Sequence, residues 1–440
     1  MIPALTASKI YSTLGNTNSL VPMAIKDIAN SCGLTAGSYI TGDKLEGKDR
    51  FIDEFGTQSI WLFGIPAYKK LLDITLYKLL KIDPKFDVRN LKENRKNILE
   101  KSIEYADSSI KESIQTASKN VKFTKNLALA KFFVSTGLTI ASYAGLTKFR
   151  HKLTKKSAEK EILAELNKNK ENNLNDRFDF TKPDWSLKNQ PSFTGGVQDF
   201  MYNPVKNLMI LDGAITTERI AHSRNKQELL GYTIKEGTFW AFMYFASKPI
   251  QKYLENKADS NTKKPVSIDL DARVIESIEL ENAIKNGSLK ASTQKVLALD
   301  TPEKLLEYIH KNPDDFTVKM AKMSDVLPII KNSGQADNVD YRKFIDLEEF
   351  KDVAKKLDKL DKKFKAFQLT DLQDKSLDAF LKNVKKVKRI SVIKNIGACI
   401  GVLGIFAPAL MVLSRKMNKD NQSFQVKEDL KKKIIANQNQ

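Results

Sequence analysis

The sequence NIGACIGVLGIFAPALMVLS, residues 395–414, contains twenty consecutive residues without a charged side chain. A helix of this length covers about 30 Å, which is the thickness of the hydrocarbon core of a bilayer. Basic residues flank the stretch at 385–389 and at 415–416, and Pro408 is tolerated in a membrane helix. The stretch therefore predicts a membrane-spanning helix over 391–414. The alternative is a deeply buried core helix of a large soluble fold.

A second apolar segment, residues 132–147, reads FFVSTGLTIASYAGLT and is uncharged over sixteen residues. Lys131 and Lys148 lie at its two ends, and their side chains are long enough to extend toward lipid headgroups. We therefore predict a second apolar helix over 127–148, which either spans the bilayer or lies buried in a core.

Small residues recur at intervals of three or four in both segments, so they share one face of each helix. They are Gly137, Ala141 and Gly145 in the first segment and Gly397, Gly401 and Gly404 in the second. Small residues let two helix backbones approach closely inside a membrane. We expect these faces to pack the two helices against each other. The alternative is that they join two copies of the chain as a homo-oligomer.

Three blocks of similar sequence occur twice in the same order, which predicts an internal duplication. Residues 40–45, ITGDKL, match residues 215–220, ITTERI, and an aromatic segment follows each hexapeptide. The third pair of blocks precedes the two apolar segments. The matched polar and aromatic positions of the first two blocks are Thr41, Asp43, Lys44 and Trp61 in the first copy and Thr216, Glu218, Arg219 and Trp240 in the second.

The repeated hexapeptide has two interpretations. Its acid and base could form a paired site at the interface of the two copies, where transporters built from repeats bind their substrates. Alternatively, the threonine or the acid caps the first turn of a helix in each copy, and the resemblance reflects common descent only. The second interpretation is the simpler one, because it requires no ligand.

The order of these features divides the chain into six segments. They are a first repeat copy (1–152) with the apolar helix 127–148, a polar linker (153–199), the first part of the second copy (200–254), a soluble helical insert (255–385), the apolar helix of the second copy (386–417) and a polar tail (418–440). The expected fold class is all-α: a duplicated helical unit with membrane-spanning or deeply buried apolar helices and a helical soluble insert.

The insert carries two clear helix signals. Thr301 and Pro302 form a helix start, with a capping residue followed by proline at the first helical position, and Pro313 requires that helix to end near His310. Apolar residues between Phe350 and Phe367 alternate spacings of three and four, as on one face of a helix. We expect the helix that carries this stripe to form part of a helical hairpin inside the insert.

The sequence lacks the residue patterns that common catalytic and cofactor sites require. The three histidines, His151, His222 and His310, are far apart, and the two cysteines, Cys32 and Cys399, support neither a disulfide framework nor a cysteine-rich zinc module. No phosphate-binding loop, dinucleotide fingerprint or nucleophile elbow occurs in the sequence. We therefore expect a protein without enzymatic activity, cofactor or metal.

The formal net charge of +20 is the abnormal bulk property of this 440-residue chain. Such a charge suits an anionic membrane surface or a nucleic acid, although an AT-rich genome would also enrich lysine. No nucleic-acid-binding motif is present, and the aromatic residues cluster in apolar runs, so anionic lipid is the favoured partner and nucleic acid is disfavoured.

These observations predict a membrane protein, most simply of the bacterial inner membrane. Residues 1–20 lack a basic region followed by an apolar run, so we expect no cleaved signal peptide; a cytoplasmic location is the alternative. The favoured function is to organise or anchor a partner at the bilayer, with the insert 255–385 as the protein-binding part. The alternatives are a small-solute transporter or channel built on the duplication and a soluble helical interaction protein.

Overall fold

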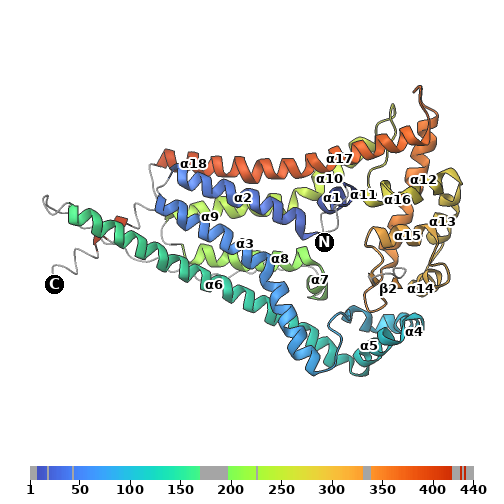
Figure 1. Ribbon diagram of the computed structural model, residues 1–440, viewed down its shortest axis with the longest axis horizontal. Helices are drawn as coiled ribbons and strands as arrows, with labels where there is room; N and C mark the ends of the chain where they lie inside the picture. The colour runs from blue at the N-terminus through green and yellow to red at the C-terminus, as the bar shows by residue number, and fades with distance from the viewer. Residues whose placement is uncertain are drawn as a thin grey trace. The chain divides into compact units, whose positions relative to one another are not determined.

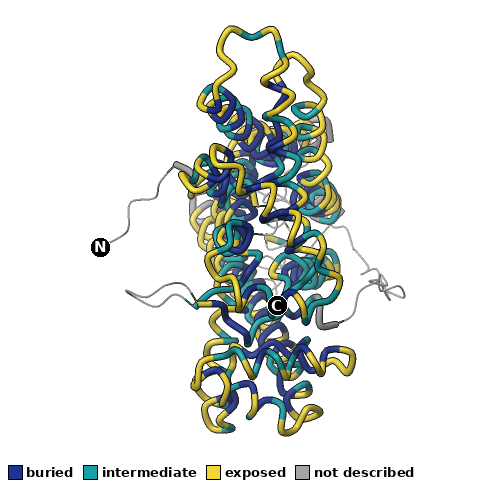
Figure 2. Tube along the Cα trace, turned by 90° about the vertical axis from the view of Figure 1, so that its right-hand side faces the viewer, coloured by how far each residue is buried: buried dark blue, intermediate teal, exposed yellow. Residues whose placement is uncertain are grey.

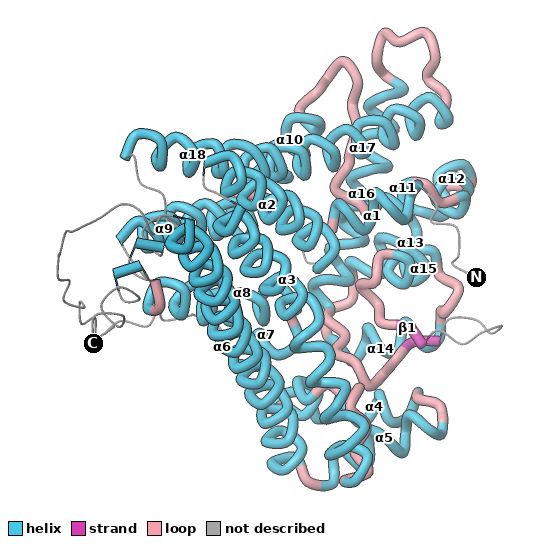
Figure 3. Tube along the Cα trace, turned by 60° about the vertical axis from the view of Figure 1, so that its left-hand side comes forward, coloured by secondary structure: helices cyan, strands magenta, loops and turns pink. Residues whose placement is uncertain are grey.

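A computed structural model shows that the described part of the chain is mostly helical, which confirms the predicted all-α class (Figure 1, Figure 3). The structure describes residues 7–16, 19–41, 44–168, 197–223, 226–330, 338–418, 427–428 and 431–432. Within these ranges the strands are β1 (Ile329–Ile330) and β2 (Asn338–Val339), which pair antiparallel. Most of the predicted linker and of the predicted tail lies outside the described residues.

The described chain falls into two compact units, and each unit combines three separate stretches. Unit 1 comprises Met1–Pro22, Lys69–Phe132 and Ser247–Ile396. Unit 2 comprises Met23–Tyr68, Phe133–Ala246 and Gly397–Gln440. These units cross the segment boundaries expected from the sequence, because residues 69–132 of the proposed first copy belong with the insert. The proposed duplication of the chain stays a prediction.

Unit 1 is built from short helices. They are α1 (Ala7–Gly15), α4 (Lys96–Tyr105), α5 (Ser108–Lys119), α10 (Ser247–Asp259), α11 (Ala272–Ile275), α12 (Ile278–Lys285), α13 (Ser288–Leu297), α14 (Pro302–Lys311), α15 (Phe316–Met323), α16 (Leu347–Gln368) and most of α17 (Leu377–Gly401), with single turns η1 (Asp73–Tyr77), η2 (Val88–Leu91) and η3 (Glu93–Arg95). The helix start predicted at Thr301 is confirmed, since its hydroxyl accepts the Lys304 backbone N–H at 3.3 Å.

The core of unit 1 forms around α16. The apolar stripe predicted between Phe350 and Phe367 faces inward, and Leu357 and Leu360 in its middle are fully buried. Phe364 and Phe367 pack on Phe380 of α17, with ring centroids 5.3 and 5.4 Å apart. Buried and exposed positions alternate around the helices, as a 3.6-residue period requires (Figure 2). Helix α16 and the start of α17 thus act as an amphipathic pair.

Polar contacts tie residues 83–105 to the rest of unit 1. The Arg342 guanidinium lies 2.8 Å from the Asp83 carboxylate, and the Asp87 backbone N–H donates to the Arg342 carbonyl at 3.0 Å. The Tyr105 ring stacks on His310 with centroids 4.1 Å apart. These contacts explain why this stretch packs with the insert.

Unit 2 is a bundle of longer helices. They are α2 (Leu20–Thr41), α3 (Lys44–Leu72), α6 (Val121–Lys168), α7 (Val197–Tyr202), α8 (Pro204–Ala221), α9 (Lys226–Trp240), the π-helical turns η4 (Ala241–Phe245) and η5 (Val402–Phe406), and α18 (Ala407–Asn418). Helix α2 lies alongside α18, and α6 lies alongside α3 (Figure 1). Helices α2, α3, α6 and α17 contribute residues to both units.

Two helical stretches are long and apolar enough to cross a membrane. They are Val121–Ala164 in α6 and Leu377–Leu413, which runs through α17, η5 and α18. The segments predicted at 127–148 and 391–414 lie inside them. A continuous helix leads into the second apolar segment, whereas Asn120 separates α5 from α6 ahead of the first.

The predicted packing of the two apolar helices through their small residues is wrong within the described chain. A Cβ atom added at Gly137, Gly145, Gly397 or Gly401 would meet no atom within 4 Å, so these glycines face open space. Gly404 alone of the predicted glycines makes a close approach in the described residues, and its partner is Ala29 of α2. The spacing of small residues in the sequence could not identify what packs on them, because this depends on the neighbouring helices.

Candidate functional site: a buried ionic network in unit 2

The first part of α3 buries several charged side chains in the interior of unit 2, and four of them form the network described here. Asp49, Arg50, Asp53 and Glu54 are spaced by three or four residues, so they share one face of the helix. Each is less than a tenth exposed. Burying four charges requires partners from neighbouring helices, because an unpaired buried charge is very costly.

Helix α6 supplies the first of these partners. The Arg150 Nη1 atom lies 2.8 Å from the Asp53 Oδ2 atom, and its Nε lies 3.7 Å from Asp49. The Thr154 hydroxyl donates to the Asp49 carboxylate at 2.5 Å. Arg150 also donates to the Tyr232 hydroxyl of α9 at 3.1 Å, so three helices meet at this side chain.

Arg219 of α8 joins four helices. Its Nε donates to the Tyr143 hydroxyl of α6 at 2.8 Å, and its Nη1 lies 2.5 Å from the Glu236 carboxylate of α9. Its Nη2 donates to Asp53 at 3.4 Å and to the Thr57 hydroxyl at 3.1 Å. The guanidinium, with five donors in a fixed plane, is suited to such multiple contacts.

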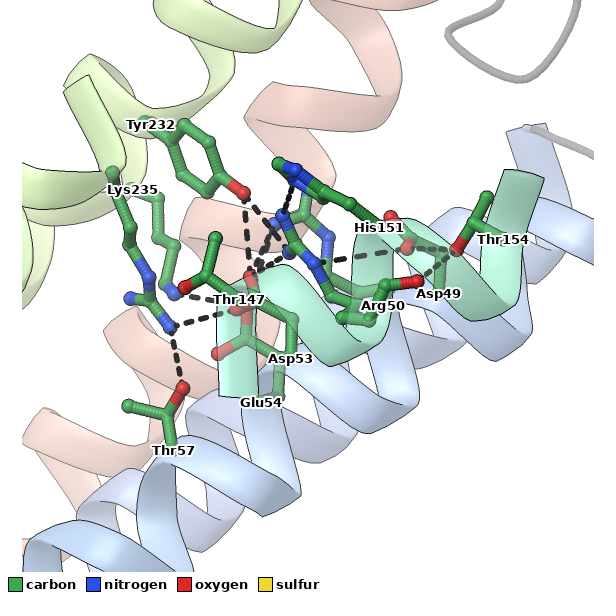
Figure 4. Close-up of polar contacts among 12 residues, drawn as sticks. Asp49, Arg50, Asp53, Glu54, Thr57, Thr147, His151, Thr154, Tyr232 and Lys235 are labelled. Carbon is green, nitrogen blue, oxygen red and sulfur yellow. Dashed lines mark hydrogen bonds and ion pairs between the residues drawn. The ribbon is translucent and has the colours of Figure 1, made fainter. Parts of the chain in front are cut away.

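Lys235 of α9 completes the network. Its Nζ lies 2.9 Å from Glu54 and 3.5 Å from Glu236. Arg50 lies 3.4 Å from Glu54 and stacks over the Tyr232 ring at 5.5 Å (Figure 4). Every charge of the network described so far has at least one opposite charge nearby.

The electrostatics of the network follow from this pairing. Burial raises the pKa of Asp53, but Arg150 and Arg219 outweigh it and hold that pKa well below its usual range. Burial likewise raises the pKa of Glu236, and Lys235 and Arg219 reverse the shift, so its pKa is lowered. Both carboxyls therefore stay ionised at neutral pH.

A small cavity lies at one side of the network, inside unit 2. About 20 Å³ of it is open to the centres of water molecules, which is room for roughly one water molecule. Its walls come from α2, α3, α8 and α9. They are Asp27, Asn30, Glu54, Thr57, Trp61, Asp212, Ile215, Arg219, Lys235, Glu236 and Phe239.

The residues of the predicted repeat motif have different places in the two copies. Thr41 lies in the last turn of α2, where its hydroxyl donates to the Gly37 carbonyl, and Lys44 is exposed at the start of α3. Trp61 is buried against the cavity. Asp43 lies outside the described residues.

At the matched positions 216–219, Arg219 is buried, and Thr216 and Glu218 are half-buried. Thr216 and Arg219 lie inside α8. The Thr216 hydroxyl donates to the Glu236 carboxylate at 3.0 Å, and the Arg219 guanidinium pairs with the same carboxylate. The Trp240 indole donates to Thr216 at 3.2 Å, and Glu218 accepts from Thr147 at 3.3 Å. The helix-cap interpretation does not fit this copy, because these residues lie well after the first turn of α8.

Sequence reasoning identified Arg219 but missed most of the network. Two sequence features could have revealed the network. One is the group of charges at 49–54 directly before the uncharged aromatic segment 55–68, and the other is the isolated pair Lys235–Glu236 inside an otherwise uncharged stretch. Charges of this kind next to apolar helices are expected to find partners in the interior. Which helix would supply each partner depends on tertiary packing.

The described residues hold no group of three or more histidine, cysteine or acidic side chains arranged for a metal ion. The three histidines stay apart: His151 contacts Arg150, His222 contacts Glu218, and His310 stacks on Tyr105. No family model matches the sequence, and neither a curated protein nor a solved structure is significantly similar to it. The chemistry of the site therefore has to be argued from its own geometry.

Proposed function

We propose that this chain is a non-enzymatic membrane protein that anchors or organises a partner at the bilayer. In this proposal α6 and the α17–α18 stretch cross the membrane, and unit 1 carries the partner-binding surface. The buried network of unit 2 then has a structural role, since it links α3, α6, α8 and α9 through charges that have no favourable place in lipid.

The observation that carries the proposal is the exposure of the two apolar helices. In the most apolar window of 18 residues within Val121–Ala164, 33% is buried, and in the corresponding window within Leu377–Leu413, 28% is buried. A core helix of a soluble protein would be mostly buried. The large side chains left uncovered include Phe133, Leu138, Ile393, Ile405 and Phe406. Contact of this apolar surface with lipid chains is favourable, whereas its contact with water is unfavourable.

Basic residues beside both helices support attraction to anionic lipid. Lys148, Lys152 and Lys155 of α6 are exposed, as are Lys382 and Lys386 of α17. Exposed lysines near a membrane surface each contribute about 1 kcal/mol of attraction to anionic lipid. Arg150 and Lys388 do not take part, because Arg150 belongs to the buried network and Lys388 donates to the Ile268 carbonyl at 2.7 Å.

Fractionation of cells that produce the full chain tests the proposal. The protein is expected in the membrane pellet and should remain there after extraction with alkaline carbonate, which removes proteins held only by charge. Release by carbonate would show a surface-bound protein, and recovery in the soluble fraction would favour the soluble interaction protein.

A second function, transport of a small solute, has one specific observation in its favour. The cavity beside Trp61, Asp212 and Arg219 is polar, enclosed by several helices and close to buried charges, as are the substrate sites of repeat-built transporters. Its size argues for a ligand no larger than water or a small ion. Flux of protons or alkali cations into vesicles that contain the purified protein would establish transport, and the anchoring proposal predicts none.

A further inference from the structure

The cavity in unit 2 has an imbalance of charge. Four carboxyl groups line it, from Asp27, Glu54, Asp212 and Glu236, against the two cationic groups of Arg219 and Lys235. The ion pairs described above commit both cations to Glu54, Glu236 and Asp53. Asp27 and Asp212 therefore face the same small space without a cation of their own among the lining residues.

A second observation shows that the cavity needs an occupant. The side chain of Asn30 is 2% exposed and lines the cavity, and its amide Nδ2 has no hydrogen-bond partner in the described chain. A buried amide N–H group without an acceptor costs about 1–3 kcal/mol. The cavity is polar and offers room for roughly one water molecule, which could accept from Asn30 and donate to a carboxyl oxygen.

The groups that face the two aspartates come from four elements. Asp27 of α2 lies near Glu54 of α3, Asp212 and Arg219 of α8, and Lys235 of α9. Burial, followed by the negative charges of Asp212 and Glu54, raises the pKa of Asp27 to about 8. The nearby cations only partly oppose this shift.

Asp212 has its own set of neighbours. The Tyr244 hydroxyl of η4 donates to its carboxylate, and the Trp61 indole lies beside it. Burial is the largest effect and, with Glu236, it raises the pKa of Asp212 to about 7 despite these donors and Arg219. The donated hydrogen bond leaves the other carboxyl oxygen of Asp212 available to hold a proton.

We propose that Asp27 and Asp212 form a proton-binding pair, bridged through the cavity by an ordered water molecule that also accepts from Asn30. Each carboxylate takes up one proton from solvent to become a neutral carboxylic acid, and no other bond is made or broken. The two protons cancel the excess negative charge of the cavity. The ligand of this site is therefore the proton, and the site does not depend on the anchoring function.

Infrared spectroscopy on the full-length protein in detergent tests the pair directly, because a protonated carboxyl has a C=O stretching band that a carboxylate lacks. The wild-type protein should show such a band near neutral pH and lose it between about pH 6 and pH 9, the range that brackets the two titrations. Asp27→Asn and Asp212→Asn should each remove part of the band, and the double variant should remove all of it.

Asp314→Asn is the control, since Asp314 is 89% exposed in unit 1 and does not line the cavity; this variant should keep the whole band. A wild-type protein with no such band above about pH 6 would overturn the proposal, and this result needs no variant to fold. A band that persists in the folded double variant would also overturn it, because other carboxyls would then bind the protons.

Discussion

Arg150 and Asp53 lie within 2.8 Å of each other in the interior of unit 2, although one comes from the middle of α6 and the other from the first half of α3. Arg219 reaches the same carboxylate from α8 at 3.4 Å. Arg50 of α3 also lies 3.7 Å from it, so one aspartate balances three guanidinium groups that are themselves buried. The stability of the bundle should depend on this single carboxylate more than on any surface charge.

Asp53→Asn should destabilise unit 2 by about 3–5 kcal/mol, because it removes a counter-charge that three buried guanidinium groups share. Thermal unfolding followed by circular dichroism in detergent would measure the loss. Asp352→Asn is a matched control, since Asp352 pairs with Lys356 on the exposed face of α16, where such pairs contribute about 0.3–0.5 kcal/mol. Equal effects of the two substitutions would show that the network does not stabilise the bundle.

Gly33→Ala should destabilise the packing of α2 on η5 by about 1–3 kcal/mol, as overpacking of an interior contact does. The added Cβ would overlap the Gly404 carbonyl oxygen and come within 2.7 Å of Pro408 Cγ. Gly401→Ala is the control, because its Cβ meets no atom within 4 Å and alanine is the better helix former. A destabilised Gly401→Ala variant would mean that this face packs on a second copy of the chain.

The Asp83 carboxylate should make unit 1 sensitive to acid. Burial raises its pKa, but hydrogen bonds from the Lys85 backbone, Ser113 and Arg342 outweigh burial and hold the pKa below its usual range. The resulting stabilisation is complete above the unfolded pKa of about 3.9 and is lost as the pH falls through the lower folded pKa.

Asp83→Asn should therefore lower the stability of unit 1 at neutral pH by about 1.5–3 kcal/mol and flatten its dependence on pH below about 4. Denaturant unfolding at a series of pH values would measure both effects. Asp314→Asn, at an exposed position, should leave the curve unchanged. A variant that keeps the acid-sensitive slope of the wild type would exclude Asp83 as its source.

Ile405→Arg should reduce the fraction of the protein that resists carbonate extraction. Ile405 is 70% exposed on η5, inside the apolar stretch, and an arginine at the centre of a membrane helix costs about 2.5–3.5 kcal/mol of insertion free energy. Ile278→Arg is the control, because Ile278 is similarly exposed but lies in unit 1 on α12. Equal carbonate-resistant fractions for the wild type and both variants would argue against contact between lipid and the exposed face of η5.

The sequence predicted those features that depend on local pattern. The apolar stripe of α16, the cap at Thr301 and the two long apolar helices all follow from spacing and residue type within one segment. The division into two units could not be predicted, because it depends on contacts such as Asp83 with Arg342, which join residues far apart in the chain. The glycine faces show the same limit: spacing places Gly137 and Gly145 on a face, and only packing decides whether a neighbour fills it.

The candidate site was less accessible to prediction than the fold. Arg219 was singled out through its match to Lys44, yet Arg219 is buried among acids and Lys44 is exposed. Similar residues at matched positions thus met different surroundings. Asp27 and Asp212 gave no motif at all, since an acid on α2 and an acid on α8 are informative as a pair only once the two helices are known to face the same cavity.

The contact of Gly33 with Gly404 has a consequence for biosynthesis. Helix α2 leaves the ribosome long before η5 is translated, so the nascent chain cannot complete unit 2 during most of its synthesis. The Asp53 carboxylate likewise lacks its partners Arg150 and Arg219 until these residues have been synthesised. The insertion machinery or a chaperone would have to shelter these unpaired charges in the meantime, and release of a chain cut before η5 would leave α2 without its partner.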